Sequence, residues 1–274
     1  MKTQKRQFQN VIITGGSSGI GKALAKQIVQ SGSNLAIIAR TQAKLDEAIA
    51  ELTRLKVDAS QVAIAISADV SDRSKAVHAI ESAINQIGVP DLLITCAGIA
   101  RPGYFKELAL DIFEETMAIN YFGSLYCVKA ALPSMASQRS GRIVLVSSGA
   151  GLIGLFGYTP YSPSKFAVRG LAESLRGELK SMGIGLSIVY PPDTDTPQLA
   201  AENRFKPPET KKMTAMAECL SADQVAQDIL VGIRKNQFVI APGMEMTLLA
   251  RLHSLVNPIL QRQFDGIVAK MHQK

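Results

Sequence analysis

The chain opens with a short apolar run, a glycine-rich turn and a helical pattern. Residues 10–14 read NVIIT, residues 15–21 read GGSSGIG, and KALAKQIVQSG follows. Glycines let the backbone approach a pyrophosphate, and the N-terminus of the following helix offers free amides and a positive dipole end. This order predicts a dinucleotide site, with a purely structural turn as the alternative. The residues that we expect to bind the cofactor here are Thr14, Gly15, Ser17, Ser18, Gly19, Ile20 and Gly21.

Strand-like and helix-like stretches then alternate along the chain. Ala, Ile, Leu and Val dominate and only 5% of residues are aromatic, which suits a parallel sheet buried between helices. No repeat or low-complexity linker divides the 274 residues, so we expect one α/β domain, a doubly wound parallel sheet flanked by helices. The expected strands are residues 10–14, 34–39, 62–66, 91–95, 142–146, 185–190 and 238–241, with helices that include 71–87 and 110–137.

The end of the second apolar run bears on the choice of dinucleotide. An acidic residue there would bind the adenosine ribose hydroxyls of NAD, but Ala39 is small and neutral and Arg40 follows it. This pair leaves room for a 2′-phosphate and offers a guanidinium to it, so we expect NADP(H). The alternative is that Arg40 is a solvated residue after a buried strand.

Two further loops follow predicted strands and could reach the same cofactor. Asp69, next to Val70, could meet an adenine amino group, although Ser71 could cap a helix whose positive end Asp69 favours. A glycine in the second loop would let the backbone pass close to the cofactor or simply make a turn. The residues of that second loop are Cys96, Ala97 and Gly98.

A tyrosine and a lysine, Tyr161 and Lys165, lie four residues apart in a helical pattern. Residues at this spacing share a helix face, so the ammonium lies one turn from the phenol. The positive charge favours phenolate and lowers the phenol pKa toward neutral pH. Ser147 and Ser148 end the preceding strand, where chemistry gathers in open α/β sheets. The spacing alone fits an ordinary solvated helix face equally well.

An asparagine, Asn120, interrupts the helical stretch MAINYFGSLY. A side-chain amide is a mediocre helix residue, so Asn120 either kinks the helix and holds a water, or is tolerated near the end of one of two successive helices.

Three prolines surround the sequence DTDT at residues 193–196. Prolines forbid regular structure, so we expect a stiff wall or the hinge of a lid. We place this lid at about residues 192–220; a surface connection without a role is the alternative. Residues 246–274 predict a basic amphipathic tail.

The net charge of +7 permits nucleic acid, anionic lipid or a phosphorylated cofactor as a partner. No nucleic-acid-binding signature is present, so we exclude nucleic acid. The cysteines and histidines lack metal-ligand spacing, and an odd number of cysteines argues against a disulfide framework, so we expect no metal and a reducing, cytoplasmic compartment. We find neither a signal peptide nor an uninterrupted apolar span of ~20 residues.

Together these motifs resemble the short-chain dehydrogenase/reductase family, over nearly the whole chain. The motifs are Thr14-Gly15-x-x-x-Gly19-x-Gly21, Asn120, Ser148 and Tyr161-x-x-x-Lys165. The resemblance implies a single-domain Rossmann-like fold, often oligomeric, that moves hydride between a nicotinamide and a carbonyl or alcohol carbon. The chain departs from the family with Cys96 in place of an Asn and Pro192 in place of a Gly.

The resemblance also implies roles for individual residues. Tyr161 would donate the proton during reduction, and Ser148 would orient the substrate carbonyl. Lys165 would lower the Tyr161 pKa and bind the nicotinamide ribose, while Asn120 would hold a water in a proton relay. The positions that match contacts to the nicotinamide end are Pro191, Thr194 and Thr196.

Within this family, residues 154–179, 190–197 and 200–210 are similar to the 3-ketodihydrosphingosine reductases. That group reduces the ketone of a long-chain sphingoid base with NADPH. We therefore expect reduction of 3-ketodihydrosphingosine (3-oxosphinganine) to sphinganine or of a similar lipid ketone, with the tail resting on anionic lipid. The alternatives are a ketoreductase of 3-oxoacyl thioesters, steroids or small ketones, and a non-catalytic NADP(H)-binding protein.

Overall fold

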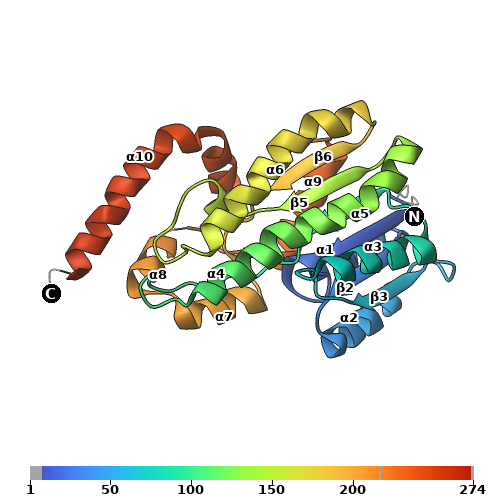
Figure 1. The fold of residues 1–274 in the computed structure, drawn as a ribbon, viewed down its shortest axis with the longest axis horizontal. Helices are drawn as coiled ribbons and strands as arrows, with labels where there is room; N and C mark the ends of the chain where they lie inside the picture. The colour runs from blue at the N-terminus through green and yellow to red at the C-terminus, as the bar shows by residue number, and fades with distance from the viewer. Residues whose placement is uncertain (1–7, 216, 273–274) are drawn as a thin grey trace.

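A parallel sheet of seven strands forms the centre of the molecule. The computed structural model describes residues 8–215 and 217–272. The strand order is β3-β2-β1-β4-β5-β6-β9, which reverses direction between β1 and β4 as in a doubly wound fold (Figure 1). The strands are β1 (Asn10–Thr14), β2 (Asn34–Ala39), β3 (Ala63–Ser67), β4 (Leu92–Thr95), β5 (Arg142–Val146), β6 (Gly185–Val189) and β9 (Val239–Ile240). The predicted fold class is confirmed, and every predicted strand bound agrees with the structure to within one residue.

Helices cover both faces of this sheet, and each face buries its own apolar core (Figure 1). The strands are apolar on both sides because neither face meets water. One face packs against α1 (Gly19–Gln30), α2 (Gln42–Arg54) and α9 (Ala222–Arg234). The other packs against α3 (Arg73–Ile87), α5 (Gly123–Gln138) and α6 (Tyr161–Ser181).

Helix α3 begins later than we predicted. Its N-cap is Asp72, whose side chain accepts a hydrogen bond from the Lys75 amide at 3.0 Å. Ser71 instead donates its hydroxyl to Asp69 at 2.7 Å. The carboxylate of Asp72 therefore takes the capping role that the sequence allowed for Ser71.

The long helical region before β5 is broken in the middle. Helix α4 (Leu110–Met117) passes into a π-helical turn, Ala118–Phe122, before α5 begins. Asn120 lies inside this turn and is 1% exposed. Such a turn inserts an extra residue into a helix and is frequent at functional sites. Neither of the two interpretations of Asn120 that the sequence allowed predicted a π-helical turn.

The expectation that the prolines after β6 exclude regular structure is wrong. Thr194–Asp195 forms a short strand, β7, which pairs with β8 (Leu220–Ser221). Pro197 begins helix α7 (Pro197–Phe205), and Pro208 begins α8 (Pro208–Thr214). Proline is tolerated in the first turn of a helix because its missing N–H has no helical partner there. Residues 197–205 and 208–214 of the segment are therefore helical.

The last helix, α10 (Met244–His272), extends to one end of the molecule (Figure 1). One side of it buries Met246, Phe264 and Ile267 against the body. The opposite stripe leaves large apolar side chains exposed, namely Met244, Leu248, Leu252, Leu255 and Ile259. Among the helices described, none is both long enough and apolar enough to cross a bilayer.

Candidate active site

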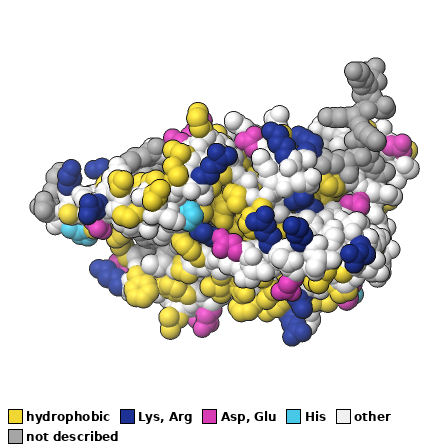
Figure 2. Space-filling model, turned by 90° about the horizontal axis from the view of Figure 1, so that it is seen from above, with side chains coloured by type: hydrophobic (Ala, Val, Ile, Leu, Met, Phe, Trp, Pro, Cys, Tyr) yellow, Lys and Arg dark blue, Asp and Glu magenta, His cyan; other side chains and the backbone are white. Residues whose placement is uncertain are grey.

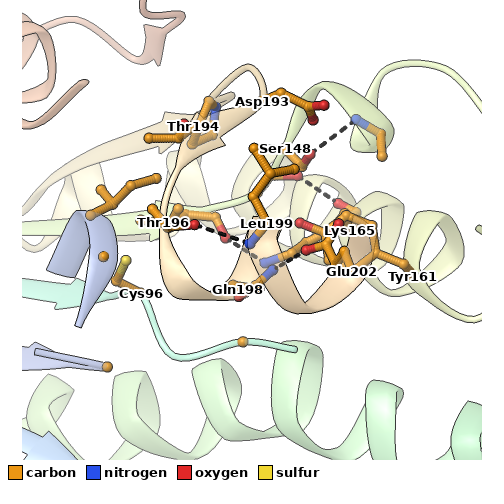
Figure 3. A pocket seen from close by; sticks show the side chains of 18 of the residues that line it. Cys96, Ser148, Tyr161, Lys165, Asp193, Thr194, Thr196, Gln198, Leu199 and Glu202 are labelled. Carbon is orange, nitrogen blue, oxygen red and sulfur yellow. Dashed lines mark hydrogen bonds between the residues drawn. The ribbon is translucent and has the colours of Figure 1, made fainter. Parts of the chain in front are cut away.

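A cleft opens at the carboxyl ends of β1, β4, β5 and β6 and is lined on another side by Thr196, Gln198 and Glu202 (Figure 3). A second cavity beside it lies over the ends of β2 and β3, and the two share Gly15, Ser18, Ala97 and Gly98. Of the predicted cofactor residues, all but Thr14 line one cavity or the other. Those lining the first include Gly15, Gly19, Ile20, Gly21, Cys96, Pro191, Thr194 and Thr196, and those lining the second include Ser17, Ala39, Arg40, Asp69 and Val70.

The glycine turn after β1 is shaped by close backbone contacts. Gly15 has a φ of 73°, and a Cβ there would lie 2.8 Å from the Ala97 backbone. Thr14 stands behind the turn and accepts a hydrogen bond from the Ala97 amide at 3.3 Å. The turn and the β4 loop are thus held together, and amides at the start of α1 face the cleft, an arrangement that fits a pyrophosphate.

The second cavity carries the groups that would select the dinucleotide. Arg40 is 60% exposed, and its Nη1 lies 3.8 Å from Asp69 and 3.9 Å from Glu115. Lys44, from the first turn of α2, also lines this cavity and was not among the residues predicted from the sequence. Its position three residues beyond the Thr41 helix cap was the available signal. Two cations and the Ser17 hydroxyl fit a phosphate monoester.

Ser148, Tyr161 and Lys165 converge on the first cavity (Figure 3). Ser148 follows β5, accepts a hydrogen bond from the Ala150 amide at 3.2 Å, and hydrogen-bonds the Tyr161 phenol. The Lys165 ammonium lies 5.6 Å from the Tyr161 ring centroid and donates to the Val146 carbonyl at 3.1 Å. The helical spacing therefore brings phenol and ammonium to one side of α6, as predicted.

The phenol pKa departs from the sequence-based expectation. Burial raises the pKa of Tyr161 above its ordinary value, and the nearby Glu202 carboxylate raises it further, while the Ser148 hydrogen bond acts in the opposite direction. Burial lowers the pKa of Lys165 to about 8. Desolvation therefore affects the pKa of the Tyr161 phenol more than the positive charge of Lys165 does in this cleft. A neutral phenol is the form that can donate a proton.

Asn120 lies behind the cleft wall. Its side chain accepts from the Ile99 amide at 2.9 Å and donates to the Ile99 carbonyl at 3.0 Å and to Ser164 at 2.9 Å. A Cβ on Gly98 would lie 3.1 Å from its Oδ1 and 3.4 Å from the Lys165 Nζ. The Asn120 amide thus fastens the β4 loop to α6 and keeps Gly98 against the lysine.

Cys96 occupies the position where the resembled family commonly has an asparagine. Burial raises the pKa of its thiol to about 11, so the side chain is neutral at physiological pH. It lines the cleft next to the glycine turn as a small apolar group. Within residues 8–215 and 217–272, no cluster of three or more His, Cys, Asp or Glu side chains could hold a metal ion.

The lid contributes buried polar groups that the sequence argument did not single out. Tyr158 donates to Glu202 at 2.8 Å, and Lys206 reaches Asp193 at 3.4 Å. The Glu202 and Lys206 residues are 7% and 4% exposed. A helix over residues 197–205, if predicted, would have placed Gln198 and Glu202 four residues apart on one face, with Lys206 at its C-cap.

Comparisons with known proteins bear on the whole chain. A protein-family model described as short chain dehydrogenase matches residues 9–207. A 3-dehydrosphinganine reductase of Danio rerio is 40% identical over 94% of this chain and 78% of its own length. A 3-ketodihydrosphingosine reductase of Bos taurus is 41% identical over 91% of this chain and 76% of its own length.

Solved structures support the fold. A short-chain dehydrogenase from Sphingobium yanoikuyae in complex with NADPH superposes with a TM-score of 0.78 and 24% identity, covering 93% of this chain and 95% of that one. A short-chain dehydrogenase/reductase from Burkholderia phymatum in complex with NAD gives 0.79 and 23%, with the same coverage. At these identities the likeness speaks to architecture alone.

Proposed function

The chain belongs to the short-chain dehydrogenase/reductase family, and on that premise we propose that it reduces 3-ketodihydrosphingosine, a long-chain amino ketone, to sphinganine with NADPH. The observation that carries the proposal is the group of Ser148, Tyr161 and Lys165 in a cleft beneath a helical lid. Relatives named for this activity, 40–41% identical over more than nine-tenths of the chain, support the substrate.

The residues of the cleft divide the work of a carbonyl reduction. NADPH, when bound, supplies the hydride to the carbonyl carbon. The Tyr161 phenol donates its proton to the carbonyl oxygen, and the Ser148 hydroxyl, which shares a hydrogen bond with that phenol, orients the same oxygen. Lys165 keeps one N–H on the Val146 carbonyl and has further N–H groups for the nicotinamide ribose. Asn120 acts from behind as a positioning residue.

Steady-state assays with purified protein test this proposal. NADPH consumption is measured with 3-ketodihydrosphingosine, with a 3-oxoacyl thioester, and with a steroid ketone. We expect the highest kcat/KM for the long-chain amino ketone. Equal or higher kcat/KM for either of the others would assign the chain to the alternative, a ketoreductase of different substrates. No turnover with any ketone would favour a binding protein.

We propose that Arg40 and Lys44 select NADPH over NADH by pairing with the 2′-phosphate. Arg40→Ala should weaken NADPH binding about 10-fold or more and leave NADH binding within a few-fold. Arg54→Ala, at the far end of α2, is the matched control that removes a cation outside the cavity. Equal loss of both dinucleotides in Arg40→Ala would contradict this role.

We further propose that the exposed stripe of α10 rests on anionic lipid. Leu248, Leu252 and Leu255 are 58%, 38% and 73% exposed, and Arg251 and Arg262 on the same helix supply positive charge. Figure 2 shows hydrophobic side chains next to Lys and Arg side chains at the end of the molecule where α10 lies. An apolar stripe beside basic residues is typical of a helix lying in a membrane interface.

Vesicle sedimentation tests this contact. Replacing the three leucines by glutamine should reduce binding to phosphatidylserine-containing vesicles, while Val57→Gln, a distant exposed apolar position, should not. A second copy of the chain is the competing occupant, because the family implies a homo-oligomer. Unchanged sedimentation together with loss of a dimer in light scattering would assign the stripe to self-association.

A further inference from the structure

A carboxylate of the lid, Glu202, faces the cleft that holds the reacting groups. It comes from α7 and lines the same cavity as Ser148 and Tyr161 (Figure 3). The residue is only 7% exposed. A buried carboxylate is costly unless a cation or hydrogen-bond donors compensate it. The position of Glu202 therefore needs an explanation.

Within the described residues, the Glu202 carboxylate accepts its hydrogen bonds from neutral donors. The Tyr158 hydroxyl donates to Oε2 and the Gln198 amide donates to Oε1, both at 2.8 Å. Residues 8–215 and 217–272 offer it no salt bridge, since the nearby lysine, Lys206, pairs with Asp193 at 3.4 Å. Burial raises the pKa of the Glu202 carboxyl, while its two hydrogen bonds and the charge of Lys206 act in the opposite direction. An ionised carboxylate has room for further donors.

The carboxylate is also close to the reacting groups. Its charge raises the pKa values of both Tyr161 and Lys165. Its hydrogen-bond partner Tyr158 lies 5.6 Å from Tyr161, measured between ring centroids. In an α-amino ketone the ammonium is carried by the carbon next to the carbonyl carbon. When Tyr161 and Ser148 bind the carbonyl oxygen, the ammonium is therefore expected near the side of the cleft that α7 forms.

We propose that Glu202, held in place by Tyr158 and Gln198, binds the ammonium group of an α-amino ketone substrate. The inference rests on the proposed function and adds the group by which this substrate is told from other ketones. The charges of Glu202, Asp193 and Lys206 sum to one negative charge, which one substrate ammonium would neutralise. A charge-assisted hydrogen bond of this kind is the stronger class.

The test compares 3-ketodihydrosphingosine with an analogue of the same chain length that lacks the amino group. The wild type should have a kcat/KM about 10-fold or more higher for the amino ketone than for the analogue. Glu202→Gln should lower this ratio of kcat/KM values about 10- to 100-fold. Reduction of the analogue by Glu202→Gln reports any effect of the lost charge on Tyr161 and Lys165 that is common to both substrates. The ratio of the two substrates isolates the ammonium from any general effect on folding.

Glu209→Gln is the matched control. Glu209 is another buried lid carboxylate that accepts a hydrogen bond from a tyrosine, Tyr104 at 3.0 Å, but it does not line the cleft. Its substitution should leave the substrate ratio unchanged. Tyr158→Phe keeps the carboxylate and removes one of its supports, so it should retain most of the preference for the amine and provides a second folded variant.

The outcomes separate the two proposals. A wild type that reduces both ketones equally well overturns the ammonium site and leaves the proposed reductase in place. A parallel fall for both substrates in Glu202→Gln, with the ratio unchanged, overturns it as well, because a purely structural carboxylate behaves in that way. A wild type that reduces neither ketone removes the proposed function and the ammonium site together.

Discussion

The two walls of the cleft are built in different ways. On the sheet side, Lys165, Ser147 and Asn120 are held by bonds to main-chain groups, such as the Ser147 hydroxyl to the Lys165 carbonyl at 2.9 Å. On the lid side, Glu202 and Lys206 are held by other side chains. The positions of the side chains in the sheet wall are therefore set by the main chain. Those in the lid wall are set by other side chains, which a few substitutions could change.

This difference suggests a division of labour between reaction and recognition. Proton transfer needs groups fixed relative to the glycine turn, and main-chain bonds from β5 and α6 provide that for any ketone. Recognition of one ketone can be left to exchangeable side chains of the lid. We expect substitutions in the sheet wall to affect every substrate and substitutions in the lid to affect some.

The largest effect should come from Tyr161→Phe. Removing the proton donor should lower kcat by about 10³-fold for every ketone that the wild type reduces, since general acid catalysis contributes 10²–10⁴-fold. Dinucleotide binding, measured by fluorescence titration, should change little. Retention of wild-type turnover with any ketone would contradict the assignment of Tyr161 and weaken the contrast between the walls.

Substitutions of two amide side chains compare how much each wall contributes to the free energy of unfolding. Asn120→Ala leaves the Ile99 main chain and Ser164 without their buried partner and should cost about 3 kcal/mol of unfolding free energy. Gln198→Ala, which removes a donor to Glu202 on the lid, should cost less than about 1 kcal/mol. Urea unfolding measures both, and equal costs would mean that the lid is as integral to the fold as the sheet wall.

The pH dependence of stability probes the sheet wall without a substrate. Burial lowers the Lys165 pKa from 10.5 to about 8 in the folded chain. As pH rises through 8 the folded state loses this proton before the unfolded state does, so unfolding free energy rises. Between pH 7 and 9 the cofactor-free wild type should gain about 1 kcal/mol relative to Lys165→Met. Parallel curves for the two proteins would show that this lysine keeps its ordinary pKa.

The smallest effect should appear in the lid alone. Lys206→Met removes the ion pair with Asp193 and should speed thermolysin cleavage within the lid a few-fold, because local opening becomes easier. The urea midpoint of the whole chain should move little. A fall in global stability comparable with that of Asn120→Ala would show that the two walls unfold together.

The sheet and the glycine turn were predictable because apolar runs and glycine spacing are local signals. The meeting of Ser148, Tyr161 and Lys165 followed from one strand end and one helical spacing. The pKa of Tyr161 was not predictable, since desolvation depends on every element packed around the phenol. The π-helical turn at Asn120 also depends on tertiary contacts, here to Ile99 and Ser164.

The secondary structure of the segment after β6 was predicted wrongly. Prolines at 191, 192 and 197 were interpreted as excluding regular structure, but Pro197 starts a helix. The buried Glu202 carries no sequence signal of its own, because glutamate on a short helix is usually solvated. Only the fold places Tyr158 and the carboxylate together across 44 residues of chain.

The two strands that enclose the lid have an evolutionary consequence. Because β7 and β8 pair at Thr194–Leu220 and Asp195–Ser221, the chain leaves the body and returns to it at one point. The residues between those anchor points lie outside the main sheet, so we expect changes in their number or identity to leave its register in place. Libraries confined to residues 197–219 therefore offer a direct way to evolve new ketone preferences while Ser148, Tyr161, Lys165 and Thr196 are kept.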